Sequence, residues 1–547
     1  MSRDSSVEPP ARILFSLLHA GYLRHYAEPI QLLAERGHSI HISLYRQHDK
    51  SVETPLLDEL LRLPSITAGP MPRRPQSDGW RGIAWLVRAL VDLLRYGDPR
   101  FDAAPALRER VGVKIRERLL KTRTNPLTRR LTRRAISWIA RRPKPASARR
   151  RIAFLAKVEM AVPTSREIDE LIRAYGANAV IASPVVEIGS PQVEFIKSAL
   201  RLRIPCAVAV ASWDNLTSKG LLRVVPDRVI VWNEIQRGEL EEMHSVPGDR
   251  VIVTGAQKFD RWFERSTSTS YEDFATRVGL DPSRQFLVYL CSSSFIAPDE
   301  LSFVRRWLQA LRESGDPALE SIGVVVRPHP QNTAEWVDPD LSPFENVVVF
   351  PRGGQHPDVG DAEAVFFDSM AHSTAVVGIN TSAQIDAAIV GKPVFTVRTF
   401  AQSQEGTLHF HYLLRENGGF VRDAGNLDEH VAQLRDALAD RGSYEGEIES
   451  FVSSFVRPHG IDRPAAPLVA DAIEAVAAVR PRPRRFSPTV AVLHALLWPI
   501  AASLRLSTVI WFLRHSRRLR AAPELGDASV PAAAIITDAE RARSDVV

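Results

Sequence analysis

Short runs of aliphatic residues alternate with longer amphipathic segments along most of this chain. The runs have no polar position between their apolar residues, which is typical of parallel strands buried on both faces. The segments between them repeat apolar residues every three or four positions, as helices that cover a sheet do. We predict strands at residues 12–17, 39–45, 179–183, 206–211, 228–232, 251–254, 286–290, 322–326, 347–350, 375–379 and 394–397. The alternation predicts an α/β protein of doubly wound, Rossmann-like parallel sheets.

The chain has 547 residues, which is too long for one such sheet, so we expect at least two domains. No strand pattern occurs in the stretch between the two groups of strands, and an arginine-rich helical stretch interrupts the first group. The predicted organisation is an N-terminal domain at 11–254 with a helical insertion at 80–151, a linker at 255–284, a C-terminal domain at 285–475, interfacial helices at 486–520 and a disordered tail at 527–547.

The net charge of +6 conceals a strongly basic insertion. Residues 100–151 contain 18 Lys and Arg but three acids, so this segment carries +15 and the remainder −9. A local field of this size predicts an anionic partner: lipid headgroups, an acidic polymer or nucleic acid. Near an anionic leaflet each Lys or Arg contributes ~1 kcal/mol. Nucleic acid is the least favoured partner, because few aromatic side chains, Trp138 among them, lie among the basic residues of this segment.

The segment from residue 486 onwards is apolar enough to meet a membrane. Residues 486–504 are 19 positions without a charge, close to the ~20 that span a bilayer. Two prolines and then Arg505 interrupt this stretch before a second apolar run at 506–513. We therefore predict a pair of amphipathic helices that lie in the membrane interface, with Trp498 and Trp511 as anchors.

One strand of the second half ends in polar side chains. Its valines lead into Arg327-Pro328-His329-Pro330, and the first proline ends the ladder and exposes Arg327 and His329 at the carboxyl end. A guanidinium beside an imidazole suits a nucleotide diphosphate, with Arg327 on the phosphates and His329 near the leaving oxygen. The alternative is a Pro-His-Pro turn that only closes the strand.

A later strand runs into a hydroxyl-rich turn. Thr381 and Gln384 have capping-box spacing, which predicts a helix that begins directly after the strand. The free N–H groups and positive dipole end of that helix would favour a phosphate beside Asn380, Thr381, Ser382 and Gln384. The alternative is that these side chains merely cap their own helix.

Three consecutive serines follow the first strand of the second domain. Small residues let a ligand approach the backbone, so Ser292, Ser293 and Ser294 could donate backbone or hydroxyl hydrogens to a phosphate. An ordinary serine-rich loop is an equal alternative.

If a hydroxyl of a second substrate, the acceptor, attacks such a nucleotide, a nearby group must take the proton of that hydroxyl. Asp214, in a loop after a strand, could take the proton from an acceptor hydroxyl as it attacks, or could merely form an Asx-turn. Glu187 and Glu405 are weaker candidates for this base.

A metal is not expected. His409 and His411 lie two positions apart without a clear third ligand, which is a poor metal site. We expect no cofactor, since a nucleotide-activated donor would be a substrate.

Four segments together resemble a GT-B-type glycosyltransferase, of the branch that resembles the CDP-glycerol glycerophosphotransferases and capsule-polysaccharide transferases. They resemble that family's His-Gly-Thr-Pro-x-Lys loop, Gly-x-Pro-Arg-x-Asp turn, His-Pro motif and Asp-Tyr-Ser-Ser turn. In this chain they are Ser212–Gly220, Thr254–Asp260, Arg327–Pro330 and Asn380–Ser382. The resemblance implies a GT-B fold, in which two Rossmann-like domains face each other across a cleft. Because GT-B proteins often place acceptor-side residues in the first turn of the N-terminal domain, the resemblance also makes His19 the rival of Asp214 as the base.

The resemblance also implies a function. We expect transfer of a sugar, or a glycerol-phosphate-like group, from a nucleotide-sugar or CDP-alditol donor to a lipid-linked or polysaccharide acceptor. The alternatives are an enzyme like the sugar-nucleotide 2-epimerases, although their His-Arg-Arg-Glu-Asn run is absent, and a non-catalytic protein that binds membranes or anionic polymers.

The expected location is the cytoplasmic face of the cell membrane, with an anionic membrane surface as partner. Residues 1–10 lack the apolar core of a signal peptide. Cys206 and Cys291 lie in or at the end of apolar runs, which predicts buried, reduced thiols.

Overall fold

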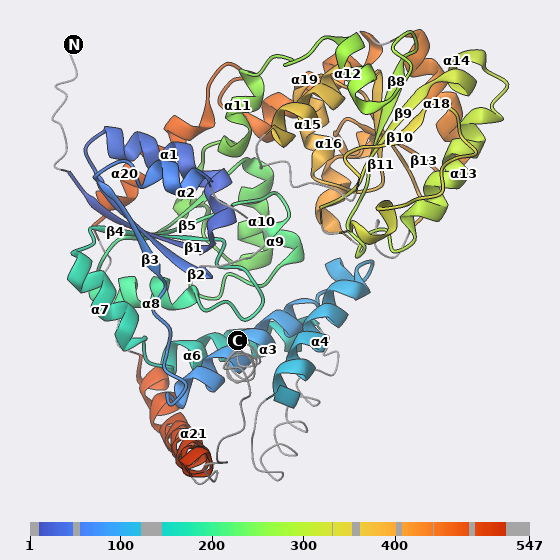
Figure 1. The fold of residues 1–547 in the computed structure, drawn as a ribbon. Coiled ribbons are helices and arrows are strands. Elements are labelled where there is room, and N and C mark those ends of the chain that lie inside the picture. The colour runs from blue at the N-terminus through green and yellow to red at the C-terminus, as the bar shows by residue number, and fades with distance from the viewer. Residues whose placement is uncertain are drawn as a thin grey trace, which may run out of the picture.

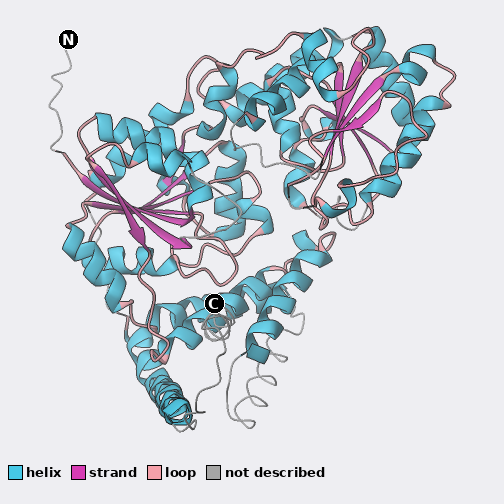
Figure 2. Cartoon of the chain, viewed as in Figure 1, coloured by secondary structure: helices cyan, strands magenta, loops and turns pink. Residues whose placement is uncertain are grey.

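The structure, a computed structural model, describes residues 10–46, 55–121, 145–330, 332–352, 361–400, 407–440, 442–480 and 487–520. These residues form two parallel sheets, one of seven strands and one of six, with helices around each (Figure 1). The strands of each sheet lie between layers of helix (Figure 2). The predicted fold class, two doubly wound domains of the GT-B type, is confirmed.

The N-terminal sheet has the strand order β3-β2-β1-β4-β5-β6-β7, and every neighbouring pair is parallel. Its strands are β1 (Arg12–His19), β2 (Ser39–Arg46), β3 (Ile66–Pro70), β4 (Ala179–Ser183), β5 (Cys206–Ala209), β6 (Arg228–Val231) and β7 (Val251–Val253). All positions of β4 and β5 are buried, because helices cover both faces of the sheet. Cys206 is buried and unpaired with another cysteine, as predicted.

Helices pack on both faces of this sheet. Side chains of α1 (Leu23–Glu35) and α20 (Ala465–Ala477) form the core on one face. Side chains of α7 (Arg166–Tyr175) and α8 (Val193–Leu202) form it on the other. Two further helices of this domain are α2 (Pro55–Leu60) and α10 (Glu234–His244).

The C-terminal sheet has the order β10-β9-β8-β11-β12-β13, again all parallel. Its strands are β8 (Phe286–Leu290), β9 (Gly323–Arg327), β10 (Val347–Val349), β11 (Ala375–Gly378), β12 (Val394–Val397) and β13 (Val421–Ala424). Its helices include α11 (Asp260–Phe263), α12 (Tyr271–Val278), α13 (Glu300–Arg312), α14 (Pro317–Ser321), α15 (Ala362–His372), α16 (Ala383–Ile389), α18 (Leu427–Ala439) and α19 (Glu445–Phe451).

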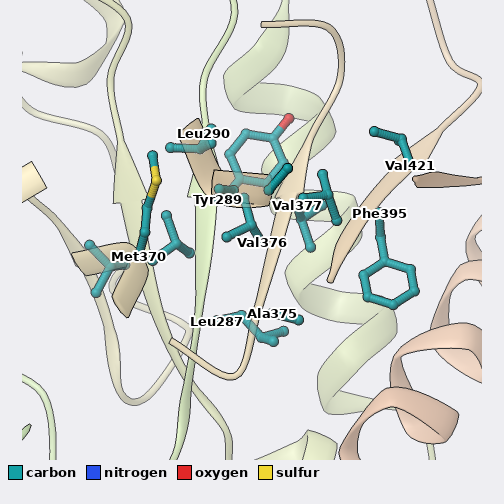
Figure 3. Close-up of a cluster of buried hydrophobic side chains, with 14 of the residues drawn as sticks. Leu287, Tyr289, Leu290, Met370, Ala375, Val376, Val377, Phe395 and Val421 are labelled. Carbon is teal, nitrogen blue, oxygen red and sulfur yellow. The ribbon is translucent and has the colours of Figure 1, made fainter. Parts of the chain in front are cut away.

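Apolar side chains of the central strands fill the core of this domain. Figure 3 shows Tyr289 of β8 beside Val376 and Val377 of β11, with Phe395 of β12 further along the sheet. These side chains have no measurable exposure to solvent. The continuous apolar runs of the sequence are explained by this two-sided burial.

Two predicted domain limits need correction. The predicted C-terminal domain ended at residue 475, but α20 packs in the core of the N-terminal domain, so the chain returns to that domain before its end. The predicted linker, 255–284, includes α12, whose Phe274 stacks on Phe286 in the core of the C-terminal domain at a centroid distance of 5.7 Å. The apolar side chains of α20 pack in the core of the N-terminal domain, and those of α12 pack in the core of the C-terminal domain.

The predicted insertion contains α3 (Trp80–Arg95), α4 (Pro105–Lys121) and α6 (Pro145–Ala161). Residues 122–144 of the predicted insertion, Trp138 among them, lie outside the described residues. Arg88 of α3 is buried between two carboxylates, with Nη2 2.7 Å from Glu159 of α6 and 2.5 Å from Glu194 of α8. The pair with Glu159 joins α3 to α6, and the pair with Glu194 attaches α3 to the rest of the domain.

The predicted pair of interfacial helices is one helix, α21 (Pro488–Arg520), which continues through Pro499. In the part of the chain described here, its segment Pro488–Leu506 is the one stretch long and apolar enough to cross a membrane, and 6% of it is buried. His494 stacks on Trp80 of α3 at a centroid distance of 5.2 Å, so one side of α21 is docked. Its exposed apolar side chains include Val492, Leu496, Trp498 and Ile500.

Candidate functional site

Ligands of open parallel sheets bind at the carboxyl ends of strands where the strand order reverses. In the N-terminal sheet the reversal lies between β1 and β4, which end at His19 and Ser183. In the C-terminal sheet it lies between β8 and β11, which end at Leu290 and Gly378. The predicted residues His19, Ser292 and Asn380 therefore stand at or directly after strands that flank a reversal.

Loops from the carboxyl edges of the two sheets contact each other. Trp213, in the loop after β5, donates from Nε1 to the hydroxyl oxygen of Ser382 at 2.9 Å. The Trp213 ring also packs edge-on against His409, with centroids 4.5 Å apart. His409 Nδ1 lies 3.2 Å from the hydroxyl of Thr217. The two predicted halves of the site therefore meet through side chains.

Asp214 lies beside this contact, just before the short helix α9 (Asn215–Ser218). Its carboxylate accepts a hydrogen bond of 3.0 Å from the hydroxyl of Ser218. Burial would raise the pKa of Asp214, but the charge of Lys219, with His409 and nearby serine hydroxyls, lowers that pKa to about 2. Asp214 is therefore ionised at neutral pH.

A lysine and a second carboxylate complete the N-terminal side. Lys219 Nζ lies 3.1 Å from Glu187, in the loop after β4. Burial opposes the charged form of Lys219, but Asp214, Glu187 and Tyr22 outweigh it and raise its pKa. Burial, with Glu187, raises the pKa of Tyr22 to about 12. His19 packs edge-on against Tyr22 at a centroid distance of 4.8 Å, so all three described acceptor-side candidates gather here.

The backbone N–H of Ser292, the first of the three predicted serines, already has a hydrogen-bond partner within the protein. The peptide N–H of Ser292 donates to both carboxyl oxygens of Glu300, at 3.0 and 2.9 Å. The hydroxyl of Tyr289 also donates to Glu300, at 3.2 Å. The predicted backbone donor to phosphate is thus already used at Ser292, whereas Ser293 is half-buried and Ser294 is exposed.

The turn after β11 uses its side chains partly to stabilise itself. Gln384 accepts from the N–H of Thr381 at 3.3 Å, which is one of the two bonds of the predicted capping box, and donates to the carbonyl of Gly378 at 3.1 Å. The second bond of the box is replaced by a donor one residue earlier, the N–H of Ala383, at 3.5 Å from the Thr381 hydroxyl, and the N-cap of α16 is Ser382. Asn380 donates from its side chain to the hydroxyl of Thr407 at 2.5 Å and from its N–H to the hydroxyl of Ser292 at 3.3 Å. The capping alternative is therefore present, and a phosphate at this turn stays a prediction.

Arg327 is a buried guanidinium at the carboxyl end of β9. It is 7% exposed, and its Cζ lies 4.9 Å from the ring centroid of Phe366. Within the described part of the chain its Nη1 has no hydrogen-bond partner. Burial lowers the pKa of Arg327 to about 9, and no carboxylate among the described residues offsets this effect. A buried cation of this kind would be stabilised by an anionic ligand.

His329 is half-buried beyond the end of β9, and its carbonyl accepts from the N–H of Asn332 at 2.9 Å. The predicted role of His329 at the leaving oxygen stays a prediction. Glu405, a weaker candidate, lies outside the described residues.

No group of three metal-ligating side chains occurs among the residues that the structure describes. His409 is instead a neutral ring, because burial, with Lys219 and His411, lowers its pKa to about 4 in spite of Asp214.

Comparisons with known proteins give fold matches alone. No protein-family model matches the chain, and no curated protein matches its sequence. A putative UDP-N-acetylglucosamine 2-epimerase from Listeria monocytogenes matches with a TM-score of 0.48 at 10% identity, over 87% of this chain and 100% of that one. A glycosyltransferase from Rickettsia africae matches with a TM-score of 0.47 at 11% identity, over 85% of this chain and 98% of that one.

The wall teichoic acid polymerase TagF matches as well. Its TM-score is 0.42 at 11% identity, over 86% of this chain and 90% of that one. These proteins represent both the transferases that the sequence resembles and the epimerases of the alternative, and all are named as enzymes. At such low identity the matches concern the fold and do not determine the function.

Sequence reasoning overlooked part of this site. Lys219 stood in the Ser212–Gly220 motif, and its place in the family's loop could have singled it out. His409 was weighed only as a metal ligand. Asp92 and Arg95, which hold the Asp214 loop, had a visible signal, because they are charges at helical spacing within an apolar run.

Proposed function

We propose that this protein is a glycosyltransferase that moves a sugar, or a glycerol-phosphate-like group, from a nucleotide donor to a lipid-linked or polysaccharide acceptor. The observation that carries the proposal is the meeting of two different strand-end sites. One side offers Arg327, a buried cation with no carboxylate partner among the described residues, and the other offers Asp214, an ionised carboxylate. A donor with an anionic leaving group and an acceptor that must lose a proton need this pair of charges.

On the donor side, Arg327 would bind the diphosphate and His329 would stabilise charge on the leaving oxygen. Ser293, Ser294 and the turn around Thr381 would contact the nucleotide. Burial supports the role of Arg327, since an unscreened guanidinium attracts phosphate more strongly than an exposed one.

On the acceptor side, two groups could share the proton. Asp214 has a pKa too low for a strong base, but it can orient an acceptor hydroxyl and stabilise a cation beside it. His409 is neutral at pH 7 and lies near that carboxylate, so it could take the proton while Asp214 stabilises the imidazolium. His19 remains the rival base.

The acceptor would be presented at a membrane. The outward side of α21 carries exposed Val492, Leu496, Trp498 and Ile500, while its other side is docked on the protein. Exposed arginines of α6, Arg149 and Arg150, add positive charge to the same insertion. An apolar helix face with nearby cations is suited to lie on an anionic bilayer.

The test is nucleotide binding by thermal shift, with UDP, CDP, GDP, CMP and dTDP as probes. A ligand at a hundred times its Kd stabilises the folded state by about 2.7 kcal/mol. We expect a shift with one diphosphate, which Arg327→Met abolishes and His329→Ala weakens.

Arg312→Met is the matched control, because Arg312 donates to carbonyls of Ile322 and Glu345, which precede β9 and β10. It should lower stability and leave the nucleotide shift intact. No shift in folded wild-type protein would reject the donor site. Formation of an isomerised nucleotide sugar without any acceptor would favour an epimerase. Membrane binding without nucleotide binding would favour a non-catalytic protein.

A further inference from the structure

The inner end of α3 holds the backbone of the loop that carries Asp214. Arg95 is 4% exposed, and its Nη1 donates to the carbonyls of Lys219 and Gly220, both at 2.8 Å. Its Nη2 donates to the carbonyl of Leu216. The guanidinium of Arg95 thus donates hydrogen bonds to three peptide carbonyls of one loop, which fixes the orientation of those peptides.

Asp92, one turn earlier on α3, connects two loops. One carboxyl oxygen accepts from the N–H of Leu221 at 2.8 Å, and the other accepts from the N–H of Gly189 at 3.0 Å. Gly189 lies two positions after Glu187, and Leu221 lies two positions after Lys219. A single carboxylate therefore bonds the backbone close to both members of the Lys219–Glu187 ion pair. Arg223 neutralises the buried charge of Asp92.

Two glycines let these loops approach α3. Gly189 has a φ of +67°, and a Cβ there would lie 2.7 Å from Nε1 of Trp85. A Cβ at Gly220 would lie 2.7 Å from a carboxyl oxygen of Asp92. Larger residues at either position would push the loop off the helix.

The rest of α3 is firmly attached. Arg88, in the middle, is held by Glu159 and Glu194, and Trp80, at the outer end, stacks on His494 of α21. A helix fixed at its outer end and middle can act as a rigid support for what its inner end holds.

We propose that Asp92 and Arg95 of α3, with Tyr96 at its C-cap, are positioning residues for the acceptor side of the site. They set the places of Asp214, Lys219 and Glu187 by bonding the peptides next to them. Tyr96 adds a hydrogen bond of 2.5 Å from its hydroxyl to the carbonyl of Lys219. The inference rests on the proposed function for its catalytic meaning, but the support itself is a property of the unliganded protein.

Amide hydrogen exchange of the full-length protein tests this without any substrate. Three variants remove the support in steps: Tyr96→Phe removes one bond, Arg95→Lys keeps a charged donor, and Arg95→Met keeps only length. We expect exchange in residues 215–221 to rise in that order, at least tenfold in Arg95→Met, with distant strands of the C-terminal domain unchanged. Tyr96→Phe is mild enough to fold even where Arg95→Met does not.

Arg74→Lys is the matched control, since Arg74 is another arginine buried in this domain, where it bonds Glu194 and Asp78 instead of the loop. It should lower the melting temperature without raising exchange in 215–221. Equal exchange at 215–221 in Arg95→Lys and Arg74→Lys, or no local rise in folded Tyr96→Phe and Arg95→Lys, would overturn the proposal.

Kinetics then separate this inference from the proposed function. Where transfer is measurable, Arg95→Lys should lower kcat about tenfold, with KM for the nucleotide and the nucleotide-induced thermal shift unchanged. A lost nucleotide shift in Arg95→Lys would overturn a role confined to the acceptor side. A wild-type protein that binds no nucleotide would remove the proposed function, while a local rise in exchange would still support the structural claim.

Discussion

Asp260 and Arg457 form a buried ion pair of 2.9 Å, although they are 197 positions apart in the chain. Asp260 lies where the chain enters the C-terminal domain, and Arg457 lies where it returns. The second carboxyl oxygen of Asp260 accepts from the N–H of Ala466 at 2.6 Å, in the first turn of α20. The two passages between the domains are therefore tied to each other.

Removal of Asp260 should destabilise the protein strongly. Asp260→Ala leaves the guanidinium of Arg457 buried without its carboxylate, which costs about 3–5 kcal/mol of unfolding free energy. The exposed pair between Arg36 of α1 and Glu474 of α20 is the control, and Arg36→Ala should cost about 1 kcal/mol or less. Urea denaturation measures both, and equal losses would contradict the central role of the buried pair.

Glu300 makes stability fall as pH rises from the acidic range to about 8. Burial raises its pKa to about 8, although the N–H of Ser292 and the hydroxyl of Tyr289 act in the opposite direction. Between its ordinary pKa and about 8 the folded state holds a proton that the unfolded chain has lost, so stability falls as pH rises through that window. Glu300→Gln keeps the shape without the charge and should flatten the decline between pH 6 and pH 8. Unfolding free energies at these pH values check this, and parallel curves would refute it.

His430 lowers the stability of the folded protein in the acidic pH range. It lies between Trp307 and Phe395, with no hydrogen bond to either ring nitrogen from the described residues, and burial lowers its pKa to about 3. Below its ordinary pKa of about 6.5 the unfolded chain binds a proton that the folded state rejects, so stability falls as pH falls through that window. His430→Leu should regain about 2 kcal/mol at pH 5 relative to its effect at pH 7. An equal effect at both pH values in urea denaturation would show that the ring is not buried neutral.

The central strands could be predicted from the sequence, as could the edge strands β7 and β10, whereas the edge strands β3 and β13 could not. Strands such as β4 and β8 are buried on both faces, which demands unbroken apolar runs. The edge strand β3 reads Ile-Thr-Ala-Gly-Pro and the edge strand β13 reads Val-Arg-Asp-Ala, so neither has such a run and neither was predicted. An edge strand is paired on one side only, and its composition is correspondingly freer.

The site was predicted as far as strand ends reveal it. Arg327 and Asp214 stand after apolar runs, and Thr381 and Gln384 have capping-box spacing, so these positions could be named from the sequence, while their roles stay predictions. Ser292 looked like a free donor because nothing local indicates that Glu300 uses its N–H. Long-range partners of this kind depend on how elements pack, which no spacing in the sequence records.

The docking of α21 depends on a glycine that precedes α3. The carbonyl oxygen of Ala501 occupies the place that a Cβ would take at Gly79, so Gly79→Val must push α21 away from the insertion. We expect faster amide exchange, or proteolysis, within residues 490–504, with the two sheets intact. Gly82→Ala is the matched control, because a Cβ at Gly82 meets open space, and alanine there should stabilise α3 by about 1 kcal/mol. If Gly79→Val left exchange in α21 unchanged, the helix would not rest on the insertion through this contact.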